Sequence, residues 1–226
     1  MDDLSLHTLD VDGALAEAAE PLGGVSRAGF LGAGLGASLA LLGLGATEAG
    51  ARQTPAGDLE ILNYALTLEY LQAAFYTEAE RMGALRGRTE RAAQVVGAVE
   101  RAHVKAFNEL LGKKAVKRPA FDFQGVTEKP RAFLKTAVAF EDLAVAAYKG
   151  QATRLQADSA LAAAVSIHSV EARHAAWMRS LFGANPARSA FDEPSSKREV
   201  TQIVRSTNFI TGAPATKGRR APRFTG

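Results

Sequence analysis

Apolar residues recur every three or four positions from residue 52 to residue 182, which is the spacing of amphipathic α-helices. No segment of this region alternates apolar and polar residues for long enough to predict a strand. The pattern predicts a single domain, an all-α antiparallel four-helix bundle in which residues 113–127 form one long crossover. Capping residues place the helix starts near Asp58, Thr89, Thr127 to Pro130, and Asp158 or Ser159, and glycines 83, 112 and 183 end the first, second and fourth helices.

The segment before the predicted bundle has the layout of an export signal. Residues 28–47 are uncharged and rich in Leu, Gly and Ala, with Ser26-Arg27 before them and Ala49-Gly50-Ala51 after them. Residues 26–31 resemble a twin-arginine signal that lacks the second arginine. A stretch of 20 residues could also span a membrane, whereas its six glycines disfavour a buried helix. We therefore expect residues 1–51 to be an export signal or membrane anchor, with membrane association only through residues 28–47, and the protein to be exported to the periplasm or cell envelope.

Charge is distributed unevenly along the chain. The formal net charge is +3, but residues 1–51 hold one basic and seven acidic side chains, so the remainder is distinctly basic. Residues 183–226 hold eight basic and three acidic side chains without an aromatic ladder, which favours an irregular, solvated C-terminal extension over a nucleic-acid site. Because the chain has no cysteine, any metal site within it must use oxygen and imidazole ligands.

One arrangement of glutamates and histidines occurs twice in the predicted bundle. Corresponding residues of the two copies lie 71 or 72 positions apart, and residues 69–76 align with residues 141–148 without a gap. Two helical hairpins related by an approximate twofold axis would bring all six side chains to one centre. The first copy is Glu69, Glu100 and His103, and the second is Glu141, Glu171 and His174.

Spacing also places the four glutamates at one depth of the bundle. Two residues of an antiparallel hairpin lie level when they are equally far from its turn, and the midpoint of each glutamate pair falls at or beside a predicted turn. Each pair lies about 15 residues, or roughly 22 Å, from its turn. Apolar residues share the helix face of each glutamate, so the four carboxylates should face one another inside the bundle.

Four buried carboxylates at one level require neutralising charge, because burying an unpaired carboxylate costs several kcal/mol. Two divalent cations would balance them, with Glu100 and Glu171 bridging, Glu69 and Glu141 terminal, and one histidine on each ion. Such ligands suit iron or manganese, and zinc also fits. The competing interpretation places these side chains on solvated faces, as for a single Glu-x-x-His. Two copies in phase with the apolar stripe disfavour it.

These residues carry a resemblance to a known superfamily. The ligand pattern, the crossover and the segment Leu62-Asn63-Tyr64-Ala65-Leu66-Thr67-Leu68-Glu69-Tyr70-Leu71 resemble the ferritin-like superfamily over about residues 58–182. The ligand set is similar to those of bacterioferritin and manganese catalase. The segment itself is similar to exported ferritin-like proteins, which include desiccation-related members.

The resemblance implies roles for further side chains. Tyr76 and Tyr148 would hydrogen-bond a ligand carboxylate of the opposite hairpin, although both also fit as core-filling residues. Bacterioferritin has an acidic residue before each bridging glutamate to orient the opposite imidazole, and Val99 and Val170 stand in these places here. His168, one turn before a bridging glutamate, is a candidate proton carrier or spare ligand, although such a histidine more often simply packs.

Two functions follow from the pattern and the resemblance. The first is a di-metal oxidoreductase, ferroxidase-like or peroxidase- or catalase-like, whose partners are metal ions and dioxygen or peroxide. The second is a non-enzymatic, metal-stabilised stress or desiccation-related protein of the cell envelope. A DNA-protecting role through the basic tail is a weaker third hypothesis, so nucleic acid is not an expected partner. A homo-oligomer is compatible with the pattern, but a closed iron-storage cage is disfavoured because it would have to accommodate the leader and the tail.

Overall fold

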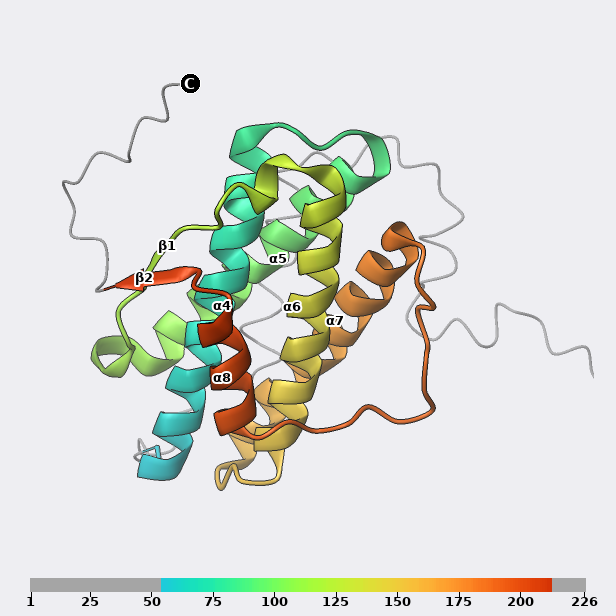
Figure 1. Ribbon diagram of the computed structural model, residues 1–226. Helices are drawn as coiled ribbons and strands as arrows, with labels where there is room; N and C mark the ends of the chain where they lie inside the picture. Colours follow the sequence, from blue (N-terminus) through green and yellow to red (C-terminus); the bar gives the residue numbers. More distant parts are fainter. Residues whose placement is uncertain (1–53, 213–226) are drawn as a thin grey trace, which may run out of the picture. The chain divides into compact units, whose positions relative to one another are not determined.

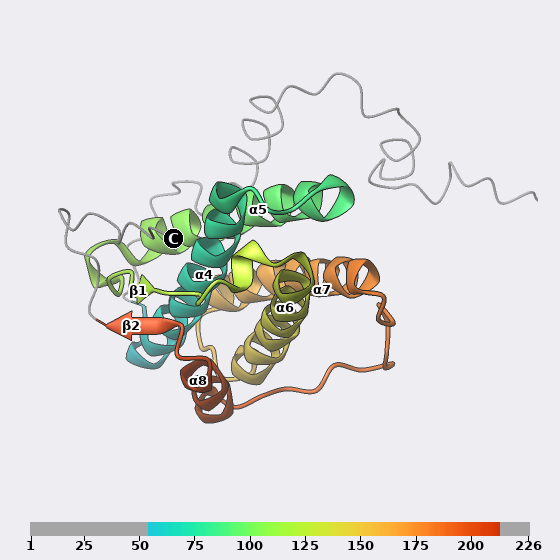
Figure 2. The same cartoon turned by 45° about the horizontal axis from the view of Figure 1, so that its top comes forward.

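The computed structural model describes residues 54–212, so the expectations for the export segment and for residues 213–226 lie outside the described residues. Four long helices dominate the described part and pack as a bundle (Figures 1 and 2). α4 packs mainly on α5, and α6 packs mainly on α7, which makes two helical hairpins. The predicted all-α bundle is confirmed. The helices are α4 (Ala56–Met82), α5 (Gly87–Leu111), α6 (Pro130–Ala152) and α7 (Asp158–Phe182).

Local sequence explains most of the helix ends. α4 ends at Gly83 and α7 ends at Gly183, and both glycines adopt the left-handed conformation, with φ of 61° and 85°. Pro130 opens α6, where its fixed φ and missing N–H suit the first helical position. α5 begins at Gly87, slightly before the predicted cap Thr89. The helix boundaries therefore place the glutamates near the middle of each helix, as the spacing requires.

A buried carboxylate fixes the two hairpins against each other at one end of the bundle. Asp58, in the first turn of α4, has no exposed surface. Its oxygens accept hydrogen bonds from the backbone N–H groups of Gln156 and Ala157, at 2.9 and 2.8 Å. These groups belong to the turn between α6 and α7, so the bonds set how far one hairpin is shifted along the other. The common level of the glutamates depends on that shift.

The crossover between α5 and α6 packs against the bundle and contains short elements. They are η1 (Gly112–Lys114), β1 (Ala120–Phe121) and η2 (Val126–Glu128). Phe123 and Thr127 are buried, and the Thr127 hydroxyl donates a hydrogen bond of 2.8 Å to Glu78 on α4. The long connection that the sequence predicted is therefore an ordered layer over one side of the four helices.

The chain returns to the bundle after α7. α8 (Lys197–Ser206) lies on α6 (Figure 1), and β2 (Ile210–Gly212) pairs antiparallel with β1. Val200, Val204 and Phe209 are buried and belong to the main apolar cluster. This part differs from the irregular extension expected for residues 183–226, because these apolar side chains pack on the bundle despite the basic composition around them.

A glycine on α6 allows the segment before α8 to approach closely. A Cβ atom at Gly150 would lie 1.9 Å from the carbonyl oxygen of Ser195, so a larger residue could not occupy this position without a backbone shift. The backbone N–H of Ser195 donates a hydrogen bond of 3.0 Å to the carbonyl of Ala146. Ser196 and Glu199 then form a capping box that starts α8.

Two apolar clusters lie on either side of the glutamates along the bundle. One cluster contains stacked and edge-on aromatic rings, with Phe75 contacting Phe123, Phe133 and Phe140 at centroid distances of 5.1 to 5.4 Å. The other cluster contains Leu66 and residues near the opposite end of the helices. On α5 and α7 the glutamate lies between the residues of one cluster and those of the other. The carboxylates are therefore enclosed by apolar layers.

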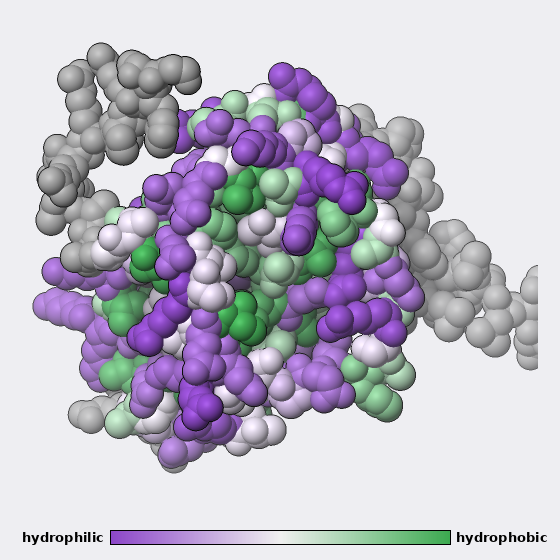
Figure 3. Space-filling model, viewed as in Figure 1, coloured by the Kyte–Doolittle hydropathy of each residue, from purple (hydrophilic) through white to green (hydrophobic). Residues whose placement is uncertain are grey.

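The surface of the bundle is mixed. On the face shown in Figure 3, polar side chains alternate with small apolar patches. Of the helices within residues 54–212, none combines the length and the apolar character that crossing a membrane requires. The only segment for which the sequence predicts membrane association, residues 28–47, lies outside the described residues.

Candidate metal centre

Each of the four long helices places one glutamate in the middle of the bundle. These glutamates, at positions 69, 100, 141 and 171, have no exposed surface. His103 and His174 follow Glu100 and Glu171 by three residues, and residues three apart on a helix share a face. The structure therefore brings together all six side chains that the repeat singled out. Their role as metal ligands stays a prediction.

The six side chains form two overlapping donor groups. Within each group, one donor atom of every residue lies within 4.8 Å of the others. Glu100 and Glu171 belong to both groups, and each group has its own histidine and its own outer glutamate. One group is Glu69, Glu100, His103 and Glu171, here called the His103 position; the other is Glu100, Glu141, Glu171 and His174, here called the His174 position.

The two shared carboxylates each present one oxygen to each histidine. Glu100 Oε1 lies 3.0 Å from His174 Nδ1, and Glu100 Oε2 lies 3.7 Å from His103 Nδ1. Glu171 has the reciprocal arrangement, with Oε1 at 3.2 Å from His103 Nδ1 and Oε2 at 3.9 Å from His174 Nδ1. A carboxylate oriented in this way can bridge two cations that lie beside the two imidazoles.

Tyrosines of the opposite hairpin hold the two outer glutamates. Tyr76 on α4 donates a hydrogen bond to Glu141 Oε1, and Tyr148 on α6 donates one to Glu69 Oε1. Burial and the neighbouring carboxylates raise the pKa of both tyrosines well above its usual value, so both keep their protons and act as donors. The remaining oxygen of each outer glutamate faces a histidine, at 3.2 Å for Glu69 and 3.5 Å for Glu141.

Burial and nearby charges shift the pKa of the donors. Burial raises the pKa of Glu69 to about 7, against the opposing effect of His103. Burial and then Glu100 raise the pKa of Glu171 well above its usual range. Burial opposes protonation of His174, but Glu100 and Glu141 outweigh it and raise its pKa to about 10. For Glu100, burial is outweighed by the two histidines, which lower its pKa to about 2. Without cations, the centre therefore retains protons at neutral pH.

Several donor atoms of the centre lack a hydrogen-bond partner in the described part of the chain, and this bears on whether cations fit there. Within residues 54–212, both oxygens of Glu100, Glu171 Oε1 and His174 Nδ1 are buried and make no well-directed hydrogen bond, although the carboxylates and imidazoles lie 3.0 to 3.9 Å apart. Buried polar atoms without a partner are costly and rare in folded proteins. All four atoms belong to the residues that both donor groups share or to a histidine of one group. Two divalent cations would coordinate these atoms and balance the charge of four carboxylates, so the residues present fit a pair of metal ions.

The other candidate residues lie beside this centre and not within it. His168 belongs to neither donor group, and its buried Nε2 makes no hydrogen bond within residues 54–212. Val99 and Val170 are partly buried and offer no polar group to an imidazole. The imidazoles are instead placed by the contacts of Nδ1 with carboxylates.

Sequence reasoning missed Gln72, which is 2% exposed and contacts the centre directly. Its amide nitrogen donates hydrogen bonds to Glu141 Oε2 at 3.2 Å and to Glu171 Oε2 at 3.4 Å. The residue lies one turn after Glu69 on the same helix face, and a polar residue within an apolar stripe was the available clue.

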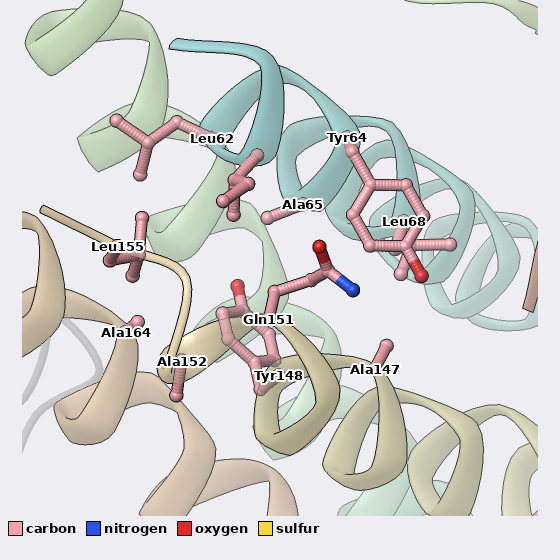
Figure 4. A pocket seen from close by; sticks show the side chains of 11 residues that line it. Leu62, Tyr64, Ala65, Leu68, Ala147, Tyr148, Gln151, Ala152, Leu155 and Ala164 are labelled. Carbon is pink, nitrogen blue, oxygen red and sulfur yellow. The ribbon is translucent and has the colours of Figure 1, made fainter. Parts of the chain in front are cut away.

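A small apolar pocket approaches the centre between α4 and α6 (Figure 4). Leu62, Ala65 and Leu68 line it from α4, and Ala147 and Tyr148 line it from α6. Because the Tyr148 hydroxyl donates to Glu69, the pocket ends one side chain away from the His103 position.

An antiparallel four-helix bundle with one long crossover and a carboxylate and histidine cluster between its helices is the arrangement of the di-metal carboxylate bundles. The sequence model described as the ferritin-like domain matches residues 57–184, which is more than half of the chain. The chain belongs to this family.

The solved structures include a protein of similar fold. The crystal structure of hypothetical protein MJ0754 from Methanococcus jannaschii DSM 2661 is similar with a TM-score of 0.52 and 14% sequence identity, over 70% of this chain and 98% of that chain. At this identity the similarity shows the fold alone. No match was found among curated proteins.

Proposed function

We propose that the protein binds two iron or manganese ions at the His103 and His174 positions and uses them in redox chemistry with dioxygen or peroxide. One observation supports this above all: six buried donors form two groups that share Glu100 and Glu171, and four of the donor atoms make no well-directed hydrogen bond within residues 54–212. Two neighbouring iron or manganese ions would supply electrons to dioxygen or peroxide, or accept electrons from a reductant.

The residues of the chain would each contribute to this chemistry in a defined way. Glu100 and Glu171 hold the two positions close together, because each carboxylate reaches both histidines. Tyr76 and Tyr148 fix the outer glutamates through one oxygen and leave the other oxygen directed at the centre. The apolar clusters on either side limit access of water, which strengthens electrostatic interactions at the centre.

Metal analysis of the purified full chain tests the binding. The protein should carry about two ions of iron, manganese or zinc per chain, as expected for such centres. Replacing both shared ligands, Glu100→Gln with Glu171→Gln, should remove most of this metal. Glu109→Gln is the matched control, because Glu109 is exposed and its ion pair within the described residues is with Lys105, on the surface of α5. Equal metal content in the double variant and the control would reject the proposal.

Turnover then distinguishes an enzyme from a structural metal protein. The loaded protein should consume peroxide or oxidise ferrous iron faster than the same concentration of free ions, and the double variant should not. A protein that binds two ions but accelerates neither reaction would instead support the metal-stabilised stress or desiccation-related protein of the cell envelope.

We also propose that the chain is exported through residues 1–51. The support is the sequence alone, with its uncharged residues 28–47 between Arg27 and the small residues at 49–51. Cell fractionation of the full chain and of a chain lacking residues 28–47 provides the test. Finding both chains only in the cytoplasm would contradict export.

A further inference from the structure

The two hairpins repeat the six donor residues and the two tyrosines, but they differ at a buried position that contacts the carboxylates. Residues 69–76 of α4 correspond to residues 141–148 of α6, and the glutamate and tyrosine at the ends of each segment make reciprocal hydrogen bonds. Within these segments Gln72 corresponds to Ala144. Both are 2% exposed, so one hairpin directs an amide at the carboxylates and the other directs only a methyl group.

The contacts of Gln72 fix the orientation of its amide. Its nitrogen lies 3.2 Å from Glu141 Oε2 and 3.4 Å from Glu171 Oε2. In the ionised form that would bind cations, both carboxylate oxygens only accept hydrogen bonds, so in that form the amide presents its NH2 group to both. One side chain therefore joins an outer glutamate to a shared glutamate, and Ala144 cannot do the same in the other half.

Both oxygens that Gln72 contacts face the His174 position. Glu141 belongs to that position alone. Glu171 reaches His174 with the same Oε2 that Gln72 contacts, whereas it reaches His103 with Oε1. The amide therefore acts on one half of an otherwise repeated centre.

We propose that Gln72 makes the two metal positions unequal, so that the His174 position takes up the first divalent cation and the His103 position takes up the second. Gln72 is a positioning residue, because it acts through Glu141 and Glu171. The inference rests on the metal binding proposed above and is independent of turnover.

The geometry around Glu141 favours the His174 position. Glu141 is held at both oxygens, by Tyr76 at Oε1 and by Gln72 at Oε2, so less freedom is lost when a cation binds. Each oxygen retains a second lone pair for the cation. Losing such an outer contact typically weakens metal binding by about 10 to 100-fold.

Stepwise addition of Zn²⁺ to the metal-free full chain, followed by nitrogen NMR of the histidine side chains, tests the order of filling. Zinc is diamagnetic, and the Nδ1 resonance of each histidine reports its own position. Below one equivalent, the His174 signals should change before those of His103. If the His103 signals change first, or both change together, the inference is wrong. If neither changes while the protein stays folded, metal binding itself fails, which is a separate result.

Variants at position 72 test whether the amide causes the order. Gln72→Met keeps the length of the side chain and removes the donor, so both histidines should respond together and the affinity for the first ion should fall about 10 to 100-fold. Gln72→Ala, which gives both halves the same residue at this position, should abolish the order in the same way. Far-ultraviolet circular dichroism shows whether each variant is folded. A folded variant of either kind that keeps the wild-type order and affinity would overturn the assignment.

Discussion

At the residue scale, it is energetically unfavourable to bury the donors of the centre in the ionised form that would bind cations. Four carboxylates with no exposed surface face two histidines. Burial raises the pKa of Glu69 to about 7, and the neighbouring carboxylates raise that of His174 to about 10 despite burial. Protons therefore occupy the centre when cations do not, and the two must compete.

This competition predicts that stabilisation by metal grows as pH rises. The pKa of Glu69 is about 7 in the folded chain against 4.5 ordinarily, so folding without metal loses stability as pH rises through this window. The raised pKa of His174 contributes stability that is complete below 6.5 and is lost as pH rises through about 10. Cations replace these protons, so the difference in Tm between Mn²⁺-loaded and chelator-treated protein should increase from about pH 5 to about pH 8. A constant or shrinking difference would contradict this.

The tyrosines allow a second prediction at this scale. Tyr76→Phe and Tyr148→Phe each remove a hydrogen bond to a buried carboxylate and should lower metal affinity about tenfold. Tyr70→Phe is the matched control, because the Tyr70 hydroxyl donates to Asn108 at 2.9 Å, outside both donor groups. The control should lower the free energy of unfolding by about 1 kcal/mol and leave affinity unchanged. Calorimetric titration with Mn²⁺ measures affinity, and equal affinity in all three variants would exclude a role for the two tyrosines at the centre.

The six central residues could be found from sequence because their spacing is periodic and repeated. In each hairpin the two glutamates are equally far from the turn, so they must lie side by side. This spacing alone predicts that Glu69, Glu100, Glu141 and Glu171 meet, as the structure shows. Gln72 could not be assigned in this way. It occurs once, and whether its amide reaches a carboxylate depends on a rotamer and on the distance between α4 and α7, which the hydrophobic pattern does not determine.

At the element scale, the approach of α4 to α5 depends on a glycine inside a helix. A Cβ atom at Gly97 would lie 2.8 Å from the Tyr76 Cβ and 2.3 Å from Glu80 Oε1. Helix propensity alone favours alanine at this position by about 1 kcal/mol. The clash with a neighbouring Cβ cannot be relieved by a side-chain rotation, so the helices would have to separate. The position of Tyr76, and with it that of Glu141, depends on this contact.

Gly97→Ala should therefore destabilise the protein by about 1 to 3 kcal/mol, because overpacking outweighs the gain in helix propensity. It should also weaken Mn²⁺ binding, since Tyr76 would be displaced. Gly57→Ala is the matched control, because a Cβ there would lie 3.7 Å from the Gln156 amide, an ordinary contact. The control should leave stability unchanged or slightly raised. Urea denaturation measures both, and a Gly97→Ala variant as stable as the control would refute the close approach.

Helices with strong periodicity were predictable, and short elements that depend on the rest of the fold were not. Pro130 and Gly183 punctuate long amphipathic stretches, so α6 and α7 were placed correctly. α8 has ten residues, and a helix of this length is marginal by itself in water. Its stability comes from packing Val200 and Val204 against the bundle, which a local pattern does not reveal.

At the scale of the whole molecule, charge balance links the stability of the bundle to its occupancy. In the ionised form that would bind cations, four carboxylates face two imidazoles and leave two negative charges uncompensated even when both histidines are protonated, so the metal-free centre must hold further protons on carboxylates such as Glu171. The hairpins meet at this level, and both apolar clusters adjoin it. The charge that disfavours the empty bundle is therefore located where the two hairpins must pack together.

Removing two of these charges should make the metal-free bundle more stable and insensitive to metal. In the Glu100→Gln, Glu171→Gln variant, the remaining pairs are Glu69 with His103 at 3.2 Å and Glu141 with His174 at 3.5 Å, which balance when the imidazoles are protonated. Replacing buried ionic groups by neutral side chains of similar volume is often neutral or stabilising, by up to about 4 kcal/mol. The wild type should instead gain about 2.7 kcal/mol from metal at 100 times its Kd. Thermal unfolding with Mn²⁺ or with chelator compares the two, and Glu109→Gln should behave as wild type. A double variant that is less stable than the metal-free wild type, yet still stabilised by Mn²⁺, would show that the shared glutamates neither strain the empty bundle nor hold the cations.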